Sequence, residues 1–538
     1  MSGLVGSSQY FFGDTGFYGY EIGQSCRFSE DNSEYLSRAV SSSGNRKTFT
    51  MSCWVKKGDS TGGKLFSSGT SATEITEFAI QGDDYLRFRD RTGGDNLRKD
   101  TTALLRDVNA WYHLVCAVDV TQASNSNRVK IYINGTLQTA FDTDDTFVNR
   151  NTYVNKSGDN GLVVGKRAYD SASLYDGYMA EYHFIDGTQV TADSFGETKE
   201  GVWIPKAYTG SYGTNGFYLK FDQTGTGTAS ASTIGADSSG NNNHLTSTNL
   251  ASIDSNRTDS PTNNFATWNS EWAGAGTYGT HGTIVNGALE LSSVGSVTNA
   301  FCSQTLPSSG KYYAEMRVSS FNSFSGGVMQ SAPTIHRSVL FETDGTIDQD
   351  NSQVQSGLTS FTNGDTIGIL CDMDAGTVQF KLQNSNYGSA VTLTSTDDQG
   401  EYLFMCRANA YVELRTDTRD FAYSIPDGYT TLSTANYPEP PISPLDGEQP
   451  SNYFKTLLYT GNDAASRTIT GVGFQPDWVW AKDRSTTAYA RIFDAVRGAD
   501  STPAMKILYP NVNTGDSGGL GTNGSFSAIT SDGFTITE

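Results

Sequence analysis

The sequence predicts an all-β protein made of tandem antiparallel β-sandwiches (jelly rolls), joined by linkers rich in Gly, Ser, Thr and Pro. Three observations support this fold class. The 538 residues include 57 Gly, 28 Phe and 28 Tyr, with only 18% charged residues, a composition that favours strands and turns over helices. Apolar residues recur with period two in short runs bounded by turn residues. The chain is also longer than the roughly 250–300 residues at which single cores stop growing.

The first alternating run is TFTMSCWVKK at residues 48–57, which predicts a strand with Trp54 on the face opposite the core. WYHLVCAVDV at 111–120 repeats this pattern. In RVKIYINGTLQ at 128–138, the Asn134-Gly135 pair predicts a tight hairpin turn. Two further strands are expected in GLVVGKRAY and YMAEYHFIDG. The spacing of these short runs suits a sandwich rather than parallel βαβ units.

In order and spacing, these runs resemble the laminin-G or concanavalin A-like lectin family, and we assign residues 24–221 to such a jelly roll. The resemblance implies a two-sheet fold that binds glycans or proteins, often with calcium. The preceding residues 1–23 are aromatic and could form an anchoring segment that orders against a partner.

A second sandwich is expected at residues 266–437, after a connector at 222–265 that is dense in Gly, Ser, Thr, Asn and Asp. KYYAEMRVSS alternates, and GDTIGILCDMDAGTVQFKLQN predicts a hairpin around Asp374-Ala375-Gly376. Together with FAYSIPDGYTTLS, these segments resemble the SPRY family. That resemblance implies a sandwich for protein interaction whose loops do the binding.

Five prolines between Pro438 and Pro450 predict a stiff linker over residues 438–452. Residues 453–538, with FKTLLYTGN and TITGVGFQPDWVWAKDR, resemble a small β module found at the ends of marine bacteriophage virion proteins. Glu538 falls within a predicted strand, which would leave this module incomplete. The combination of units is similar to phage fibre-type proteins.

The formal net charge of -21 disfavours binding to nucleic acid and to anionic membranes. The N-terminal segment has no basic region followed by an apolar one, and no run of 18 apolar residues occurs, so we expect neither export by a signal peptide nor membrane insertion. The six cysteines are far apart and lack a CxxC pair, which indicates core packing rather than zinc or redox chemistry.

We predict no catalytic residues and no enzymatic activity. A glycoside hydrolase on this fold needs two carboxylates flanking the scissile bond. The nearest pattern, Glu342 and Asp344, has Ile347 in the third position and includes a predicted turn. The five histidines show no metal-ligand spacing, and no nucleophile elbow or phosphate-binding loop occurs.

These sequence patterns require no cofactor. A calcium ion bound by loop oxygens is the one cofactor that they leave possible. The candidate ligands are Asp159, Asp170 and Asp176, which flank the 161–169 run, although Asp is also an ordinary turn residue. Sugars stack on exposed aromatic rings. The candidate glycan-binding residues are Trp54, Trp111, Tyr169 and Tyr175, with a structural role as the alternative for each.

The leading functional hypothesis is a phage virion protein, a tail or capsid fibre, that attaches to a glycan or protein on the host surface. It would assemble with other virion proteins as a homo-oligomer, with trimers or other closed rings compatible with a fibre. One alternative is a capsid or tail decoration or connector protein without glycan binding. A second is a depolymerase that acts on surface glycan.

Overall fold

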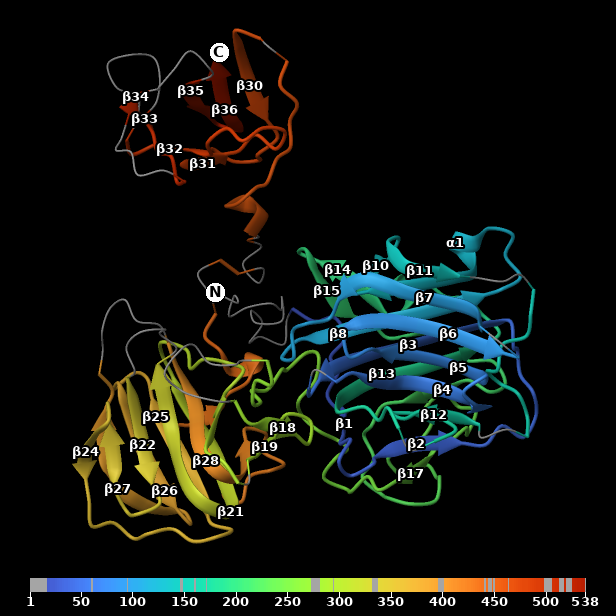
Figure 1. Cartoon of the computed structure of the whole chain (residues 1–538), viewed down its shortest axis with the longest axis horizontal. Helices are drawn as coiled ribbons and strands as arrows, with labels where there is room; N and C mark the ends of the chain where they lie inside the picture. Colours follow the sequence, from blue (N-terminus) through green and yellow to red (C-terminus); the bar gives the residue numbers. More distant parts are fainter. Residues whose placement is uncertain are drawn as a thin grey trace. The chain divides into compact units, whose positions relative to one another are not determined.

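The structure is a computed structural model that describes residues 17–537 apart from 60, 94, 146–148, 159–160, 171, 272–280, 294, 331–336, 395–400, 440–441, 444–447, 449, 463, 498–505, 512–516 and 519–524. Antiparallel strands dominate it (Figure 1), so the predicted all-β fold class is confirmed. The chain divides into two compact units, residues 1–440 and 441–538. No helix in the described ranges combines the length and apolarity needed to cross a bilayer.

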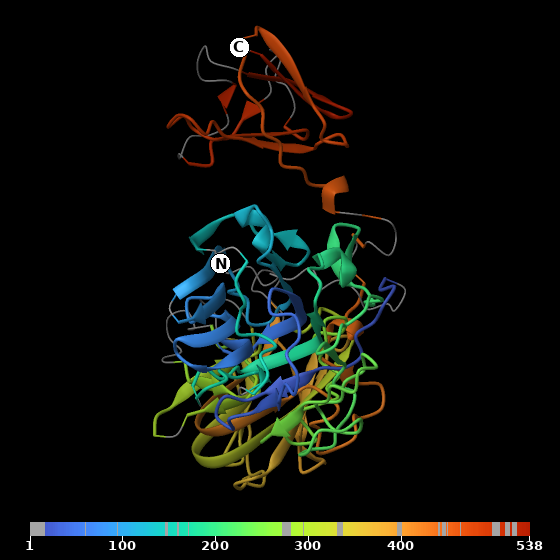
Figure 2. The ribbon, with the colours of Figure 1, turned by 90° about the vertical axis from the view of Figure 1, so that its right-hand side faces the viewer.

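Two sheets, drawn mainly in blue and cyan in Figure 2, form the first sandwich of the first unit. One apolar core lies between them. The seven-stranded sheet has, in spatial order, β1 (Cys26–Phe28), β13 (Gly177–Asp186), β3 (Thr48–Lys57), β8 (Trp111–Asp119), β9 (Val129–Ile133) and β10 (Thr136–Leu137), with β16 (Phe217–Leu219) also on β13. The eight-stranded sheet has β11 (Phe141–Asp145), β7 (Asp95–Leu104), β6 (Tyr85–Thr92), β5 (Glu74–Ile80), β4 (Gly63–Ser71), β12 (Leu162–Val164), β2 (Tyr35–Arg38) and β17 (Thr246–Thr248). A single helical turn, α1 (Asn125–Arg128), precedes β9.

The alternation read from the sequence gives the correct faces in these strands. On β3 the residues Phe49, Met51, Cys53 and Val55 belong to the core between the sheets, while Trp54 points to the opposite side. The Asn134-Gly135 hairpin is also confirmed, since both residues have positive φ angles (46° and 76°) between β9 and β10, as a two-residue turn of this kind requires.

The outer face of the seven-stranded sheet is covered. The hairpin of β14 (Gly196–Lys199) and β15 (Val202–Pro205), which follows the turn Ala192–Ser194, brings Trp203 onto it. Trp203 packs where Gly135 and Gly196 lie, and a Cβ at these glycines would come within 2.3 and 2.5 Å of its ring. Of the expected anchoring segment 1–23, residues 1–16 lie outside the described residues, and Phe17 and Ile22 are buried in this cover.

Residues 222–265, expected to be a connector, also contribute to the first sandwich. β17 pairs with β2, and Ile234, Leu245 and Leu250 belong to its core. The same segment carries buried ion pairs: Lys56 with Asp259, and Arg257 with Asp417 and Asp420. Buried charges are costly unless they are paired and hydrogen-bonded. The segment is therefore packed over much of residues 233–265, whereas residues 222–232 contain no buried residue.

The second sandwich is built around two long strands, β21 (Lys311–Gln330) and β28 (Tyr402–Arg415), which pair with each other along most of their length. The first half of β21 pairs with β25 (Thr366–Asp372), and the second half pairs with β22 (Ser338–Glu342). The predicted hairpin is β25 and β26, with Gly376 at φ 63° in its turn. The remaining strands are β18 (Thr283–Val285), β19 (Glu290–Ser292), β20 (Thr298–Phe301), β22 (Ser338–Glu342), β23 (Ile347–Gln349), β24 (Ser352–Gln355), β25 (Thr366–Asp372), β26 (Thr377–Leu382), β27 (Ser385–Thr392) and β29 (Thr430–Thr431).

The second unit has a small core of its own, in which the Phe526 ring stacks on Phe493 and Phe534. Much of the predicted proline-rich linker at 438–452 lies outside the described residues, and Pro450–Asn452 forms one 3-10 turn. The strands of this unit are β30 (Ser466–Thr470), β31 (Trp478–Ala481), β32 (Arg491–Asp494), β33 (Lys506–Ile507), β34 (Ser517–Gly518), β35 (Ser525–Thr530) and β36 (Gly533–Thr537).

Candidate functional site

Three of the four aromatic residues predicted to bind glycan are buried, and this corrects the prediction for them. The exposed fractions of Trp54, Trp111 and Tyr175 are 2%, 2% and 1%, so their rings offer no surface to a sugar. Trp54 lies under the β14–β15 cover. The indole N–H of Trp111 donates to the Asp259 carboxylate, 3.1 Å away, and the Tyr175 hydroxyl donates to the carbonyl of Lys56.

Tyr169, the fourth candidate, is half-buried in the loop between β12 and β13. The Arg167 guanidinium lies 5.0 Å from the centre of its ring. Arg167 also holds Asp170 through its Nε and Nη2 atoms, at 2.9 and 2.7 Å. Tyr169 and Asp170 therefore belong to one small cluster that is organised by an arginine.

The predicted calcium ligands do not form a metal site within the described part of the chain. Asp159 lies outside the described residues. Asp170 is paired with Arg167, and the buried Asp176 carboxyl accepts hydrogen bonds from the backbone N–H groups of Gly287 and Glu30 at 2.8 and 3.4 Å. No described group of three or more His, Cys, Asp or Glu side chains is placed to hold a metal ion.

Asp176 instead joins the two sandwiches of the first unit, because Gly287 belongs to the turn between β18 and β19. Burial raises the pKa of Asp176 to about 8, and the neighbouring charge of Asp59 adds to the effect. Burial disfavours the charged form of a carboxyl group. Asp176 thus holds a proton that most carboxyl groups have lost at neutral pH.

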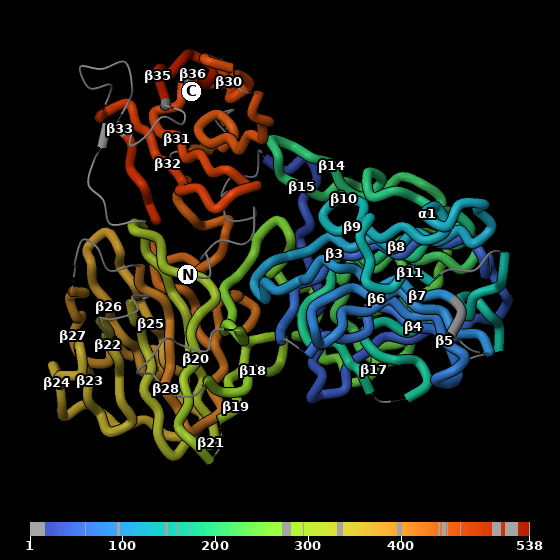
Figure 3. Tube along the Cα trace, turned by 45° about the horizontal axis from the view of Figure 1, so that its top comes forward, coloured from blue at the N-terminus to red at the C-terminus, as the bar shows by residue number. Residues whose placement is uncertain are grey.

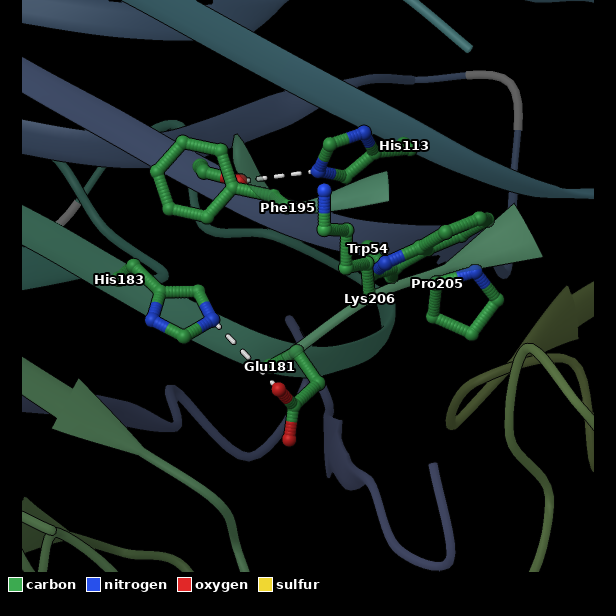
Figure 4. A pocket seen from close by; sticks show the side chains of 8 residues that line it. Trp54, His113, Glu181, His183, Phe195, Pro205 and Lys206 are labelled. Carbon is green, nitrogen blue, oxygen red and sulfur yellow. Dashed lines mark hydrogen bonds and ion pairs between the residues drawn. The ribbon is translucent and has the colours of Figure 1, made fainter. Parts of the chain in front are cut away.

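A small pocket lies between the outer face of the seven-stranded sheet and its cover (Figure 4). Its side chains leave no room even for a water-sized sphere, whereas usual ligand pockets have volumes of roughly 300–1,000 Å³. The residues that line it are Ser52, Trp54, His113, Glu181, His183, Phe195, Pro205 and Lys206.

His113 fixes the cover to the sheet. The indole N–H of Trp203 donates to its Nδ1, 3.0 Å away, so the ring proton sits on Nε2 and faces Ser52 Oγ at 2.9 Å. The His113 ring also stacks on Trp54 and Trp203. Burial, together with the nearby His183, lowers the pKa of His113 to about 3, and the imidazole is neutral at ordinary pH.

Glu181 enters this pocket because β13 contains a bulge. The register advances from Ala180 opposite Trp54 to His183 opposite Ser52, which leaves one extra residue on β13. Glu181 has a φ of +48°, a backbone conformation that non-glycine residues rarely adopt and that clusters at functional sites.

The carboxylate of Glu181 accepts hydrogen bonds from the hydroxyls of Tyr218 and Tyr20. His183 Nε2 lies 3.5 Å from it, and the Nδ1 atom of the same ring contacts the Tyr212 hydroxyl at 2.9 Å. Burial and the Glu181 charge raise the pKa of Tyr20 to about 12. Among the lining residues Glu181 is the one carboxylate, so they do not provide the pair that glycoside hydrolysis uses.

The pattern at Glu342 and Asp344 likewise forms a turn. The N–H of Glu342 donates to the carbonyl of Thr346, and Gly345 has a φ of 86°, as the sequence predicted. Burial raises the pKa of Glu342 to about 7, and the charges of Asp348 and Asp344 add to the effect. Glu342 and Asp348 belong to the adjoining strands β22 and β23 of the second sandwich, and Asp344 lies in the turn between them.

The outer face of the eight-stranded sheet carries a different set of residues. Figure 3 shows β4, β5, β6 and β7 side by side. Five basic side chains on these strands and on the adjoining loop, here called the basic face, form ion pairs with three carboxylates. The pairs are Lys64 and Arg89 with Glu77, Arg87 and Arg98 with Asp100, and Arg167 with Asp170.

Sequence reasoning missed the basic face, although alternation in YLRFRDRT at 85–92 places Arg87, Arg89 and Arg91 on one side of β6. It also missed Trp478 and Trp480, which lie two residues apart on β31 in WVWA and are 46% and 59% exposed. Their rings meet edge to face, with centroids 6.1 Å apart.

A comparison with known families agrees with the fold of the first sandwich. Residues 30–194 match the family model described as the concanavalin A-like lectin/glucanases superfamily, so the predicted lectin-type domain is confirmed for that range. Residues 449–538 match a model described as a domain of unknown function (DUF7483). No curated protein matches the chain significantly.

Several solved structures are similar to parts of the chain. The laminin α1 chain domains LG4-5 from mouse align over 74% of this chain and 88% of their own, with 9% identity and a TM-score of 0.27. A SAP-like pentraxin from Limulus polyphemus aligns over 32% and 80%, with 15% identity and a TM-score of 0.24. The SPRY domain of human HERC1 aligns over 24% and 89%, with 21% identity and a TM-score of 0.20.

Proposed function

We propose that this chain is a fibre-type virion protein of a bacteriophage, and that its lectin-like sandwich attaches the particle to glycans on the host surface. The observation that carries the binding part is the contrast between the two outer faces of the first sandwich. The seven-stranded sheet is covered by β14 and β15, whereas the outward side chains of β6 remain partly exposed and polar.

The virion part rests on the sequence resemblance of residues 453–538 to a phage β module and on the order of the units along the chain. Many copies on one particle would compensate for weak single contacts, because avidity can exceed single-site affinity by about 10²–10⁴. Localisation on the particle surface and a homo-oligomeric assembly belong to this proposal.

Binding is tested by a glycan array probed with the full chain, in its native form and as the Tyr169→Ala variant. We expect native binding to bacterial surface glycans and a loss of about threefold or more in Tyr169→Ala, because Tyr169 supports the Arg167 side chain. Tyr423→Ala is the matched control, since Tyr423 is a partly exposed tyrosine of the second sandwich. Silence of the native chain across the array would overturn the attachment role.

The virion assignment is tested separately by immunogold labelling of purified phage particles with an antibody against residues 30–194. Labelled particles support the proposal, and particles that lack the chain would refute it. Labelled particles combined with a silent array would favour a decoration or connector protein, the alternative that needs no glycan.

A further inference from the structure

Two buried carboxylates on the outer face of the eight-stranded sheet each hold two cations. Glu77 is fully buried, with Lys64 Nζ at 3.3 Å and Arg89 Nη2 at 2.7 Å. Asp100 is also buried; it takes Arg87 Nε at 2.8 Å and the guanidinium of Arg98. A buried carboxylate needs compensating charge, but one cation supplies it. At Asp100, the second cation Arg98 lies opposite Asp145 on β11, which offsets part of its charge. At Glu77, the second cation leaves a local excess of positive charge.

The register of the strands concentrates this excess. Arg89 on β6 lies directly opposite Arg98 on β7, and like charges at directly opposed positions destabilise a sheet. Burial lowers the pKa of Lys64, and the charges of Arg89 and Arg167 lower it further, against the opposing effect of Glu77. The protein as a whole has a net charge of -21, so a positively charged region differs in sign from the protein's net charge.

Arginine side chains already cover two aromatic rings of this face. The Arg87 guanidinium lies 5.3 Å from the centre of the Tyr85 ring, and Arg167 lies 5.0 Å from that of Tyr169. Neutral sugars bind largely through stacking on rings, and here guanidinium groups occupy that position. Arginine is suited to carboxylate and sulfate groups, because its planar fork matches their geometry. The composition of the face therefore favours charge recognition over ring stacking.

We propose that the basic face, formed by Lys64, Arg87, Arg89, Arg98 and Arg167, binds acidic polysaccharide that bears carboxylate or sulfate groups. This inference rests on the proposed attachment function and names its ligand class. A linear polyanion laid across β6 and β7 meets Arg98, whose side chain is 37% exposed, and the more buried Arg89 and Arg87 beside it. The carboxylates beneath would hold the guanidinium groups in place before the ligand arrives.

The test measures binding of the full chain to dextran sulfate, alginate and unmodified dextran in low-salt buffer. Dextran sulfate and dextran share a backbone and differ in charge, and alginate separates carboxylate from sulfate recognition. We expect binding to one or both acidic polymers, no binding to dextran, and an affinity that falls steeply as salt is added, since salt screens exposed charges. Equal binding to dextran and dextran sulfate would overturn the proposal.

Two variants should move the affinity in opposite directions. Arg98→Gln removes the most exposed cation while Asp100 keeps Arg87, and we expect it to weaken binding about 3–10-fold. Asp170→Asn removes the partner of Arg167, adds to the positive excess, and should strengthen binding about twofold. Arg337→Gln is the matched control, because Arg337 is paired with Asp350 on the second sandwich. If Arg98→Gln weakens binding to the acidic polymers no more than Arg337→Gln does, the proposed site is refuted.

The remaining outcomes separate this inference from the proposed function. Binding to neutral glycans on the array, without any preference for acidic polymers, would reject the basic face and leave the attachment role intact. Absence of binding to every glycan and polymer would reject both. Double-stranded DNA bound as tightly as the acidic polysaccharides would show a general polyanion site and overturn the assignment to polysaccharide. Unchanged melting temperatures of the variants ensure that a loss of affinity is not a loss of fold.

Discussion

The two sheets of the first sandwich share one core but differ in what lies on their outer faces. On the seven-stranded sheet, the outward positions carry Trp54, His113 and His183, and a hairpin far along the chain closes over them. On the eight-stranded sheet, the outward positions of β6 carry arginines that stay partly exposed. The strands on both sheets alternate in the same way, so alternation does not decide which face is covered.

The difference shows what each face contributes. Rings and a neutral imidazole fill the space under the cover, with hydrogen bonds such as Trp203 to His113 and Tyr218 to Glu181 that satisfy the polar atoms. Such an interior contributes stability. Ion pairs that are partly exposed contribute little to stability. Under the proposed function, stability and recognition fall on opposite sides of one sandwich, and variants on each side should separate the two properties.

The largest effect is expected for Trp54→Ala on the covered face. Removing a buried indole leaves a cavity and should lower the free energy of unfolding by about 3–5 kcal/mol. Trp478→Ala is the matched control, because Trp478 is 46% exposed on the second unit and should cost far less. Urea unfolding of the full chain, followed by circular dichroism, measures both. Similar losses in the two variants would show that Trp54 is not part of a packed cover.

Trp54 illustrates which features could be predicted from the sequence and which could not. Alternation in residues 48–57 placed it opposite the core, and this is where it lies. Its burial could not be predicted, because the covering Trp203 is about 150 positions away and periodicity reports only local order. The same limit applies to Tyr175 and Asp176, whose partners Lys56 and Gly287 are distant in the chain. Alternation predicts that Arg87 and Arg89 lie on one face of β6. It does not predict that Arg87 pairs with Asp100 or that Arg89 pairs with Glu77.

A pH-dependent effect is expected from His113. Its pKa is about 3 in the fold and about 6.5 in the unfolded chain, so the unfolded state takes up the proton first. The stability it contributes is present above about pH 6.5 and is lost as the pH falls toward 3, by an amount on the order of a few kcal/mol. In His113→Gln this part of the pH dependence should disappear. Urea midpoints of both proteins between pH 4 and 8 test this, and parallel curves would contradict it.

Asp176 should give the opposite pH dependence. Its pKa is about 8 in the fold and about 3.9 when unfolded, so the folded state keeps a proton that the unfolded state has lost. The stability it contributes is greatest below about pH 4 and is lost as the pH rises toward 8. Asp176→Asn should remove this decline and raise the urea midpoint at pH 8 relative to the native chain. Asp170→Asn, at a carboxylate that is 35% exposed, is the control and should leave the slope unchanged.

The smallest effect on stability is expected on the basic face. Arg98→Gln should change the free energy of unfolding by less than about 0.5 kcal/mol, because Arg98 is partly exposed and its ion pair is screened by water. Asp100 keeps its bond to Arg87 in this variant, so no buried charge is left alone. The same urea experiment measures this value beside that of Trp54→Ala. A loss of 2 kcal/mol or more, on the scale of a broken buried pair, would mean that Arg98 holds the sheet together and that the two faces are not functionally distinct.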